Sequence, residues 1–209
     1  MILLFQLIVL IFSVMVHEVS HGAVAYKLGD DTAKVLGRLN LNPLKHIDFM
    51  GSIFLPLFLI LVQSPVLFGW AKPVPYNPHN LKNPKKGAAL IGAAGPLSNL
   101  ALALIFGLLI RLTGGIFGTT DTSVAVILFF NIIVFINILL AIFNLVPIPP
   151  LDGSKLLFAL LPHRYSHIQH ALERYGIFIL IFFIFYGGQL ISPLMHSIYY
   201  FIVGQYAIF

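Results

Sequence analysis

The stretch His17-Glu18-Val19-Ser20-His21 lies within an apolar run that extends from Met1 to Ala25. Only Gln6 and Ser13 are polar before the first histidine, so the run is predicted to be buried in a membrane. An ionisable side chain at membrane depth costs about 2.5–3.5 kcal/mol on insertion scales and therefore usually has a function. Helical residues four apart share one face and differ in height by about 6 Å. The spacing therefore predicts two imidazoles on one face of a membrane-embedded helix.

Two histidines at this spacing, with a glutamate beside the first, are typical of a zinc site in which the glutamate is the general base. The chain has no cysteine, so its metal ligands must come from His, Asp or Glu. We therefore predict that His17 and His21 bind a metal and that Glu18 is catalytic. A zinc hydrolase within a membrane is the leading hypothesis.

Catalytic zinc takes three protein ligands and leaves one position open for water, so a third ligand is needed. Asp152 is the best candidate, because it follows Pro147, Pro149 and Pro150, which cannot continue a helix. Unwound backbone at membrane depth is tolerated only against protein or a water-filled cavity. In an alternative interpretation, Asp152 is the N-cap of a helix that begins near Gly153.

The composition agrees with a membrane protein, since 59% of the residues are hydrophobic and only 9% are charged. Soluble domains carry about 25% charged residues. We predict an all-α polytopic membrane protein, with one domain over residues 1–209. Five apolar segments are long enough to cross a membrane, namely residues 1–26, 49–70, 87–112, 122–149 and 176–203.

The distribution of Lys and Arg distinguishes between two topologies. If all five segments cross, the two sides hold 7 and 5 basic residues, whereas a re-entrant segment 49–70 gives 11 and 1. The positive-inside rule favours the second arrangement. We therefore predict four full crossings, with both termini outside the cell and the basic loops in the cytoplasm. The predicted location is the inner membrane of a bacterium. Gly187-Gly188 and Pro193 interrupt the last segment, which can be one span followed by a half-helix.

The loop from Ala33 to Asn42 alternates, with polar residues at most even positions and apolar residues at most odd ones. Only Leu36 and Gly37 break the pattern. A period of two is typical of a strand, so we predict a short β-hairpin near residues 33–42, which could bind an extended substrate by β-addition.

Several ordered motifs make the chain resemble the site-2 proteases, a family of intramembrane zinc metalloproteases. They are His17-Glu18-x-x-His21-x-x-x-Ala25, Gly95-Pro96-Leu97-Ser98-Asn99, and Leu151-Asp152-Gly153 preceded by Asn144 and the prolines. Residues 37–48 and 69–75 look like the compact bacterial subgroup, which lacks PDZ and CBS domains. The resemblance implies that His17, His21 and Asp152 bind one zinc ion and that Glu18 activates water. It also implies that the substrates are transmembrane helices of other membrane proteins.

Other polar residues have less certain roles. Asn99 can hydrogen-bond the substrate backbone or the oxyanion, or it can form an ordinary interhelical hydrogen bond. Asn144 can hold the unwound segment near Asp152. The role of His196 stays open. Two interpretations are open for His163, His167 and His170. They can form a second metal site on one helix face, or they can be surface histidines, which is the favoured interpretation.

Two further functions stay open, a divalent-metal transporter and a non-catalytic membrane scaffold. Intramembrane His and Asp also line ion pathways, but transporters usually show internal repeats, and none is visible here. The intact Glu18 argues against a scaffold. Basic loops explain the net charge of +5, so no nucleic-acid partner is predicted. The pattern does not indicate an oligomeric state.

Overall fold

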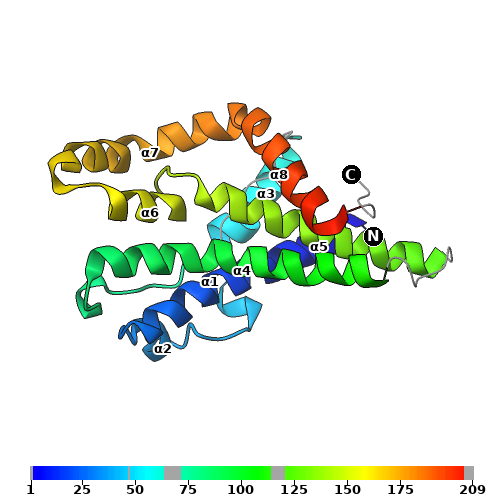
Figure 1. Cartoon of the computed structure of the whole chain (residues 1–209), viewed down its shortest axis with the longest axis horizontal. Coiled ribbons are helices and arrows are strands. Elements are labelled where there is room, and N and C mark those ends of the chain that lie inside the picture. Colours follow the sequence, from blue (N-terminus) through cyan, green and yellow to red (C-terminus); the bar gives the residue numbers. More distant parts are fainter. Residues whose placement is uncertain (1, 47, 64–71, 114–120, 205–209) are drawn as a thin grey trace.

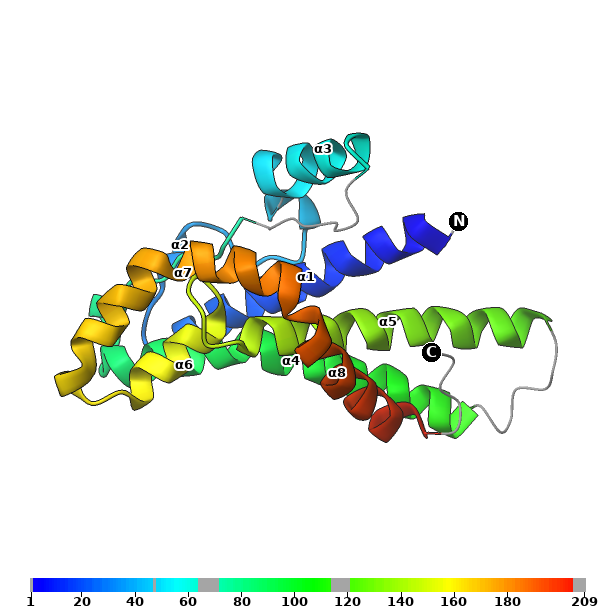
Figure 2. The same ribbon diagram turned by 90° about the horizontal axis from the view of Figure 1, so that it is seen from above.

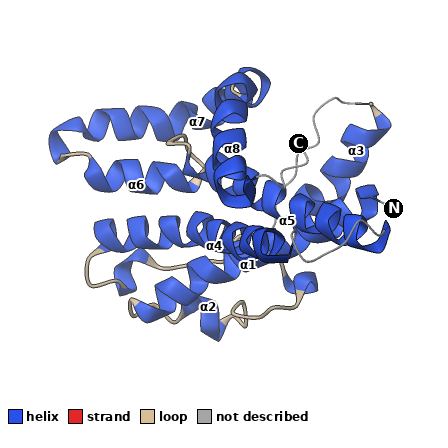
Figure 3. Cartoon of the chain, turned by 45° about the vertical axis from the view of Figure 1, so that its right-hand side comes forward, coloured by secondary structure: helices blue, strands red, loops and turns tan. Residues whose placement is uncertain are grey.

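The structure is a computed structural model that describes residues 2–46, 48–63, 72–113 and 121–204. Every regular element in these ranges is helical (Figure 3). Short 3₁₀ or π-helical turns at 43–45, 49–54, 78–80 and 163–165 accompany the α-helices. The α-helices are α1 (Ile2–Lys27), α2 (Thr32–Val35), α3 (Leu55–Leu61), α4 (Pro84–Thr113), α5 (Asp121–Leu145), α6 (Asp152–Leu160), α7 (Ser166–Tyr186) and α8 (Gly188–Val203).

Four helices are long and apolar enough to cross a membrane, which matches the predicted number of crossings. They are α1, residues Pro84–Leu112 of α4, residues Val124–Leu145 of α5, and α7. The fourth span begins at Ser166, ten residues before the predicted segment. It ends at Tyr186, and α8 follows after Gly187, so the chain breaks where the sequence predicted an interruption.

Helix α4 lies at the centre of the bundle and contacts α1, α5, α6 and α8 (Figures 1 and 2). Its small residues permit close packing, as expected for membrane helices. A Cβ atom added at Gly107 would overlap Ile202 of α8, and one at Gly92 would lie 3.1 Å from the main-chain oxygen of Asp152. The apolar core between α4, α5 and α8 is centred on Ala103, Ile110, Val134, Ile138, Met195 and Tyr199.

Large apolar side chains also cover the outside of the bundle. Along α7, one exposed row comprises Phe178, Phe182 and Phe185. Lipid tails are as apolar as these side chains, so such a surface is stable in a bilayer. The fold and its surface are those of an integral membrane protein.

The predicted β-hairpin near residues 33–42 is wrong, because these residues form a helical turn and an irregular loop. Helix α2 ends in a Schellman motif, in which the Arg38 N–H donates to Ala33 O at 2.8 Å and the Gly37 N–H to Lys34 O at 2.9 Å. Gly37 has φ of +63°, a conformation that residues with a side chain rarely adopt. The break at Leu36-Gly37 was therefore the informative part of the pattern.

Further along this loop, asparagine side chains accept hydrogen bonds from nearby main-chain N–H groups. These N–H groups are therefore not available to pair with a neighbouring strand. Asn40 Oδ1 accepts the Asn42 N–H at 2.8 Å, and Asn42 Oδ1 accepts the Leu44 N–H at 3.1 Å. Such local bonds compete with β-pairing. Among residues 33–42, no strand is formed.

The apolar segment 49–70 forms a π-helical turn at Phe49–Phe54 and then α3, which has only 7 residues. At 1.5 Å per residue, α3 is about 10 Å long and too short to cross a membrane. It lies apart from the central helices in Figure 2. Residues 64–70 of the segment lie outside the described part of the chain, so its full path stays a prediction.

Candidate metal centre

The two histidines project from one face of α1 into the interior of the bundle. His17 and His21 are both buried, with relative exposures of 5% and 6%. Their rings lie 4.7 Å apart between centroids and almost perpendicular to each other, at 88°. The helical spacing of four therefore places both imidazoles side by side, as predicted from the sequence.

Asp152 reaches the same place from the first turn of α6. Helix α5 ends at Leu145, and the following proline-containing residues are not helical. A Cβ atom at Gly153 would lie 2.5 Å from the main-chain oxygen of Val146, so only glycine allows this close approach. The buried Asp152 carboxylate thus faces α1 at the start of a helix.

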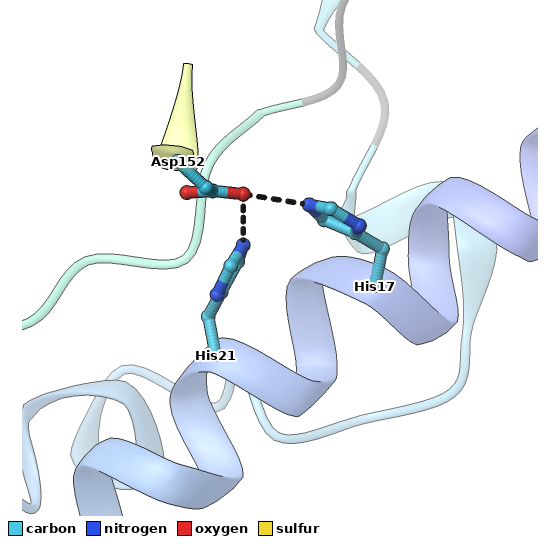
Figure 4. Close-up of side chains that lie close together, drawn as sticks. All are labelled: His17, His21 and Asp152. Atoms are coloured by element: carbon cyan, nitrogen blue, oxygen red, sulfur yellow. Dashed lines mark hydrogen bonds and ion pairs between the residues drawn. The ribbon is translucent and has the colours of Figure 1, made fainter. Parts of the chain in front are cut away.

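The three side chains converge on one point (Figure 4). The Nε2 atoms of His17 and His21 each lie 3.0 Å from the same oxygen, Oδ2 of Asp152. One ligand atom from each residue lies within 4.8 Å of the other two. In tetrahedral zinc sites with bonds of about 2.0–2.1 Å, neighbouring ligand atoms are about 3.3 Å apart. The cluster therefore has the dimensions of a zinc site.

Hydrogen bonds on the far side of each imidazole fix its tautomer. Nδ1 of His17 lies 2.6 Å from Asn99 Oδ1, and Nδ1 of His21 lies 2.6 Å from the main-chain oxygen of Ile91. Both partners are acceptors, so each Nδ1 carries a proton, and each neutral ring directs an Nε2 lone pair at Asp152. Three converging electron-pair donors repel one another unless a proton or a metal cation lies between them. This donor set fits a divalent metal.

The amide of Asn99 is held by a buried network that joins α1, α4 and α5. Its Nδ2 donates to Asn137 Oδ1 at 2.8 Å and to the main-chain oxygen of Ser13 at 3.3 Å. Asn137 in turn donates to Ser13 Oγ at 2.9 Å. These acceptors orient the amide so that its oxygen faces His17. Asn99 is fully buried, so its contacts are those of an interhelical hydrogen bond that supports His17.

Gly95 provides the space in which the two imidazoles lie. A Cβ atom added there would lie 2.6 Å from Nε2 of His21 and closer still to Nε2 of His17. Any side chain at this position would overlap the rings of both histidines. The glycine of the Gly95-Pro96 motif therefore fits a site that holds a metal.

Lys155 contacts the second oxygen of Asp152, with Nζ 2.9 Å from Oδ1. One carboxylate oxygen thus faces the imidazoles and the other faces the ammonium group. This arrangement favours binding of a metal by Asp152 through one oxygen only.

Glu18 lies beside the cluster, on the wall of a cavity of about 360 Å³ that His17, His21 and Asp152 also line. Its carboxylate is half-buried, and Oε2 accepts the main-chain N–H of Val74 at 2.9 Å. This contact fixes one oxygen of Glu18. A carboxylate at this position can take a proton from a water molecule in the cavity.

The remaining predicted residues are not part of the cluster. Asn144 lines the cavity, but its amide donates to Leu140 O one turn earlier, at 2.9 Å. His170 is exposed and lies 3.8 Å from Glu173, and His196 lies 2.7 Å from the main-chain oxygen of Ser192. The side chain of His163 lies outside the described residues. Among the described residues, neither His167 nor His170 belongs to a group of three candidate metal ligands.

Sequence reasoning missed four contributors to this site, namely Ser13, Asn137, Lys155 and the Val74 amide. Asn137 could have been identified from the sequence, because an amide side chain in so apolar a helix needs a hydrogen-bond partner. Lys155 lies three residues after Asp152, a spacing that brings helical side chains together. Main-chain donors such as that of Val74 leave no trace in residue type.

A buried cluster of two histidines and a carboxylate, set among membrane-crossing helices beside an H-E-x-x-H glutamate, is the arrangement of a membrane metallopeptidase. Residues 112–187 match Peptidase family M50. The chain is 40% identical over 197 residues to "Putative zinc metalloprotease YwhC" of Bacillus subtilis. The aligned region covers 92% of this chain and 86% of that protein. The chain therefore belongs to the M50 family of zinc metalloproteases, which confirms the resemblance to the site-2 proteases.

More distant relatives carry similar names. "Putative zinc metalloprotease Rip2" of Mycolicibacterium smegmatis is 33% identical over 177 residues, covering 82% of this chain and 62% of that protein. "Zinc metalloprotease MJ0392" of Methanocaldococcus jannaschii is 26% identical over 162 residues, covering 78% of this chain and 36% of that protein. No solved structure matches the chain.

Proposed function

We propose that this metalloprotease cleaves peptide bonds within or near transmembrane segments of other membrane proteins, with His17, His21 and Asp152 as zinc ligands and Glu18 as general base. The observation that carries the proposal is the convergence of both Nε2 atoms on Asp152 Oδ2, at 3.0 Å each. Ionisable side chains among apolar helices are costly without a partner, and one metal ion would be a common partner for all three.

The depth of the cluster supports a substrate inside the membrane. His17 and His21 precede the end of α1 at Lys27 by ten and six residues. At 1.5 Å per residue, they lie about 15 and 9 Å from that end of the helix. A peptide bond must therefore enter the membrane-embedded part of the bundle to reach them.

Zinc, when bound, supplies Lewis acidity that polarises a carbonyl and lowers the pKa of bound water to about 7. Glu18 takes a proton from the attacking water and later delivers it to the leaving amine. The Val74 N–H holds one oxygen of Glu18, so the other can face the water. Asn99 acts through His17, which it keeps in the tautomer that presents Nε2.

The substrate must change conformation before cleavage. A helix uses its carbonyls in internal hydrogen bonds, so the scissile bond becomes accessible only after local unwinding. The cavity beside Glu18, about 360 Å³ in volume, can take a short unwound segment but not a complete helix.

The distribution of basic residues over the bundle supports a membrane topology. The end that holds the loops after α1, before α4 and after α5 carries 11 of the 12 basic residues. Arg111 lies at the opposite end, where its guanidinium donates to Phe201 O at 3.4 Å. We place the basic end in the cytoplasm of a bacterial cell, and we treat residues 1–209 as one membrane domain.

The substitution Glu18→Gln tests this function. The purified protein and the variant are incubated in detergent or vesicles with a panel of single-span substrates, with and without a chelator. Glu18→Gln should bind zinc but cleave nothing, while the wild type should lose cleavage when the metal is removed. Glu173→Gln is the matched control, because Glu173 is an exposed glutamate on α7 whose contacts among the described residues are with Gln169 and His170. Cleavage by Glu18→Gln at the wild-type rate would reject the assignment of Glu18 as the general base.

A further inference from the structure

The polar side chains behind His17 form a closed ring across three membrane-crossing helices. Ser13 lies one turn before His17 on α1, Asn99 belongs to α4, and Asn137 belongs to α5. Each of these helices contacts the other two. His17 donates to Asn99, Asn99 donates to Asn137, and Asn137 donates back to α1 at Ser13. The ring therefore begins and ends on the helix that carries both imidazoles.

The ring lies away from the substrate side of the metal centre. Ser13 is only 3% exposed, and Asn99 and Asn137 are fully buried. None of the three is among the residues that line the cavity beside Glu18, whereas His17 is. These side chains therefore do not reach a peptide in that cavity, and they can act on the reaction only through His17.

Two main-chain carbonyls fix the direction of the hydrogen bonds in the ring. Asn137 Nδ2 also donates to Ile133 O at 2.9 Å, one turn earlier on α5. A carbonyl accepts but never donates, so the Asn137 atom that faces Ile133 must be the nitrogen. The Asn137 oxygen then faces Asn99, whose nitrogen donates to it and to Ser13 O. The Asn99 oxygen is left to accept from Nδ1 of His17.

Neither amide can turn round without placing two acceptors against each other. Rotation of Asn137 by 180° would place its oxygen against Ile133 O, and the same rotation of Asn99 would place its oxygen against Ser13 O. Either reversal leaves buried polar groups without partners, which is costly inside a membrane. The backbone of α1 and α5 thus decides, through two side chains, where His17 carries its proton.

His21 shows the contrast, because it reaches a fixed acceptor directly. Its Nδ1 lies 2.6 Å from the main-chain oxygen of Ile91. His17 has the side-chain amide of Asn99 in the corresponding place, and the two ends of an amide are alike in shape but opposite in hydrogen bonding. The tautomer of His17 therefore depends on what holds that amide, whereas the tautomer of His21 does not.

We propose that Asn137 and Ser13 are positioning residues of the metal centre, which orient Asn99 and thereby keep the Nε2 lone pair of His17 free for zinc. A reversed Asn99 amide would present its N–H to Nδ1, and the ring proton would then belong on Nε2, the atom that must bind the metal. The inference rests on the proposed function, because that function makes His17 a ligand.

Matched leucine substitutions on α5 test the proposal. Asn137→Leu removes the acceptor that holds Asn99. Asn131→Leu is the control, because Asn131 is also fully buried, also donates to the carbonyl one turn earlier (Ile127 O, at 2.8 Å), and also bonds another helix, through the hydroxyl of Tyr199. It lies outside the ring, six residues or about 9 Å along the helix from Asn137. Zinc affinity is measured by competition with a chelator, and folding by thermal unfolding.

Asn137→Leu should bind zinc about tenfold more weakly than the wild type. This is the lower end of the 10- to 100-fold effect of hydrogen-bond partners of metal ligands, because Asn137 acts one step beyond Asn99. Asn131→Leu should lose comparable stability and bind zinc like the wild type. Wild-type zinc affinity in Asn137→Leu, or an equal loss in both variants, would overturn the proposal.

NMR of the zinc-loaded protein, labelled with nitrogen-15 at histidine, reads the imidazoles themselves. Signals are assigned by their loss in His17→Gln and His21→Gln. Nδ1–H signals of both residues should be present in the wild type. In Asn137→Leu, the His17 signal should shift or broaden, because its acceptor is no longer held, while the His21 signal stays in place. A loss of packing alone would not single out one histidine, so unchanged signals or equal changes at both would overturn the proposal.

Ser13→Ala decides the question if Asn137→Leu does not fold, because it removes only the hydroxyl that accepts from Asn137. It should lower zinc affinity about two- to fivefold, the lower part of the value of a lost hydrogen bond, and change the same His17 signal. Unchanged affinity and an unchanged signal would overturn the proposal.

These measurements need no substrate, so they separate this inference from the proposed function. A wild-type protein that binds no zinc would overturn the proposed function itself. Zinc binding that does not respond to changes in the ring would overturn this inference alone.

Discussion

Replacing Gly95 by alanine should remove zinc binding while leaving the helix in place. The added Cβ would lie 2.6 Å from Nε2 of His21, whereas ordinary contacts begin near 3.4 Å, so that nitrogen must move by about 0.8 Å. Metal–ligand distances tolerate deviations of only about 0.2 Å. His17 must move further, because its Nε2 is closer to the new methyl group.

The expected loss in zinc affinity is on the order of 100-fold or more, since changes that only disturb the support of a ligand already cost 10- to 100-fold. The effect on folding should be small by comparison. Overpacking costs about 1–3 kcal/mol, and the better helix propensity of alanine returns about 1 kcal/mol. The variant should therefore fold and fail to bind zinc.

The assay is competition for zinc with a chromogenic chelator, combined with circular dichroism of the purified protein. Gly188→Ala is the matched control, because a Cβ atom there meets nothing within 4 Å. Wild-type zinc affinity in Gly95→Ala would refute the assignment of both imidazoles as ligands. A folded Gly188→Ala that also loses zinc would show that the assay reports a general effect of the substitution.

Two further changes test the surroundings of the site, and a third tests the buried carboxylate of Asp30. Asn99→Leu should lower zinc affinity 10- to 100-fold, because the Nδ1–H of His17 loses its acceptor. The control Asn144→Leu should leave zinc affinity unchanged. A fall in kcat with unchanged zinc affinity in Asn99→Leu would instead favour a substrate contact for Asn99. Lys155→Met should weaken zinc binding roughly 10-fold in the same competition assay, since one oxygen of Asp152 loses its partner. Burial raises the pKa of Asp30, but hydrogen bonds from Thr32, Asn77 and Asn80 outweigh it and lower that pKa. Its stabilisation is therefore complete above about pH 4 and lost as the pH falls through the folded pKa, so Asp30→Asn should flatten the dependence of the unfolding midpoint on pH between 5 and 3.

The membrane helices could be predicted because lipid imposes a simple rule on the chain. Only long apolar helices satisfy their own backbone in a bilayer, so α1, α4 and α5 followed from hydropathy. The extent of α7 did not, since its first turns, with His167, His170 and Glu173, are polar. These turns extend beyond the apolar part of the span.

The short elements between the spans were harder to predict, because they depend on contacts far away in the sequence. Residues 33–42 alternate like a strand, but Ala33 is fully buried, and Gly37 ends a helical turn there. The extended segment near the site is instead 72–77. Its prolines were visible in the sequence, but its position beside Glu18 depends on tertiary packing.

The candidate ligands could be predicted because their chemistry is rare in apolar sequence. His17, His21 and Asp152 are ionisable groups at or beside membrane spans, and the structure brings them together. The supporting residues could not be identified in the same way. Ser13 and Asn137 are common residue types, and only the crossing of α1, α4 and α5 shows that they hold Asn99.

The most direct test of the account is to locate the zinc ion itself, by anomalous diffraction at the zinc edge from crystals of the purified protein. The account predicts one strong peak about 2.0–2.2 Å from Nε2 of His17, Nε2 of His21 and an oxygen of Asp152. A peak elsewhere, for example beside His167 and His170, with the Asp152 carboxylate turned away from α1, would contradict it.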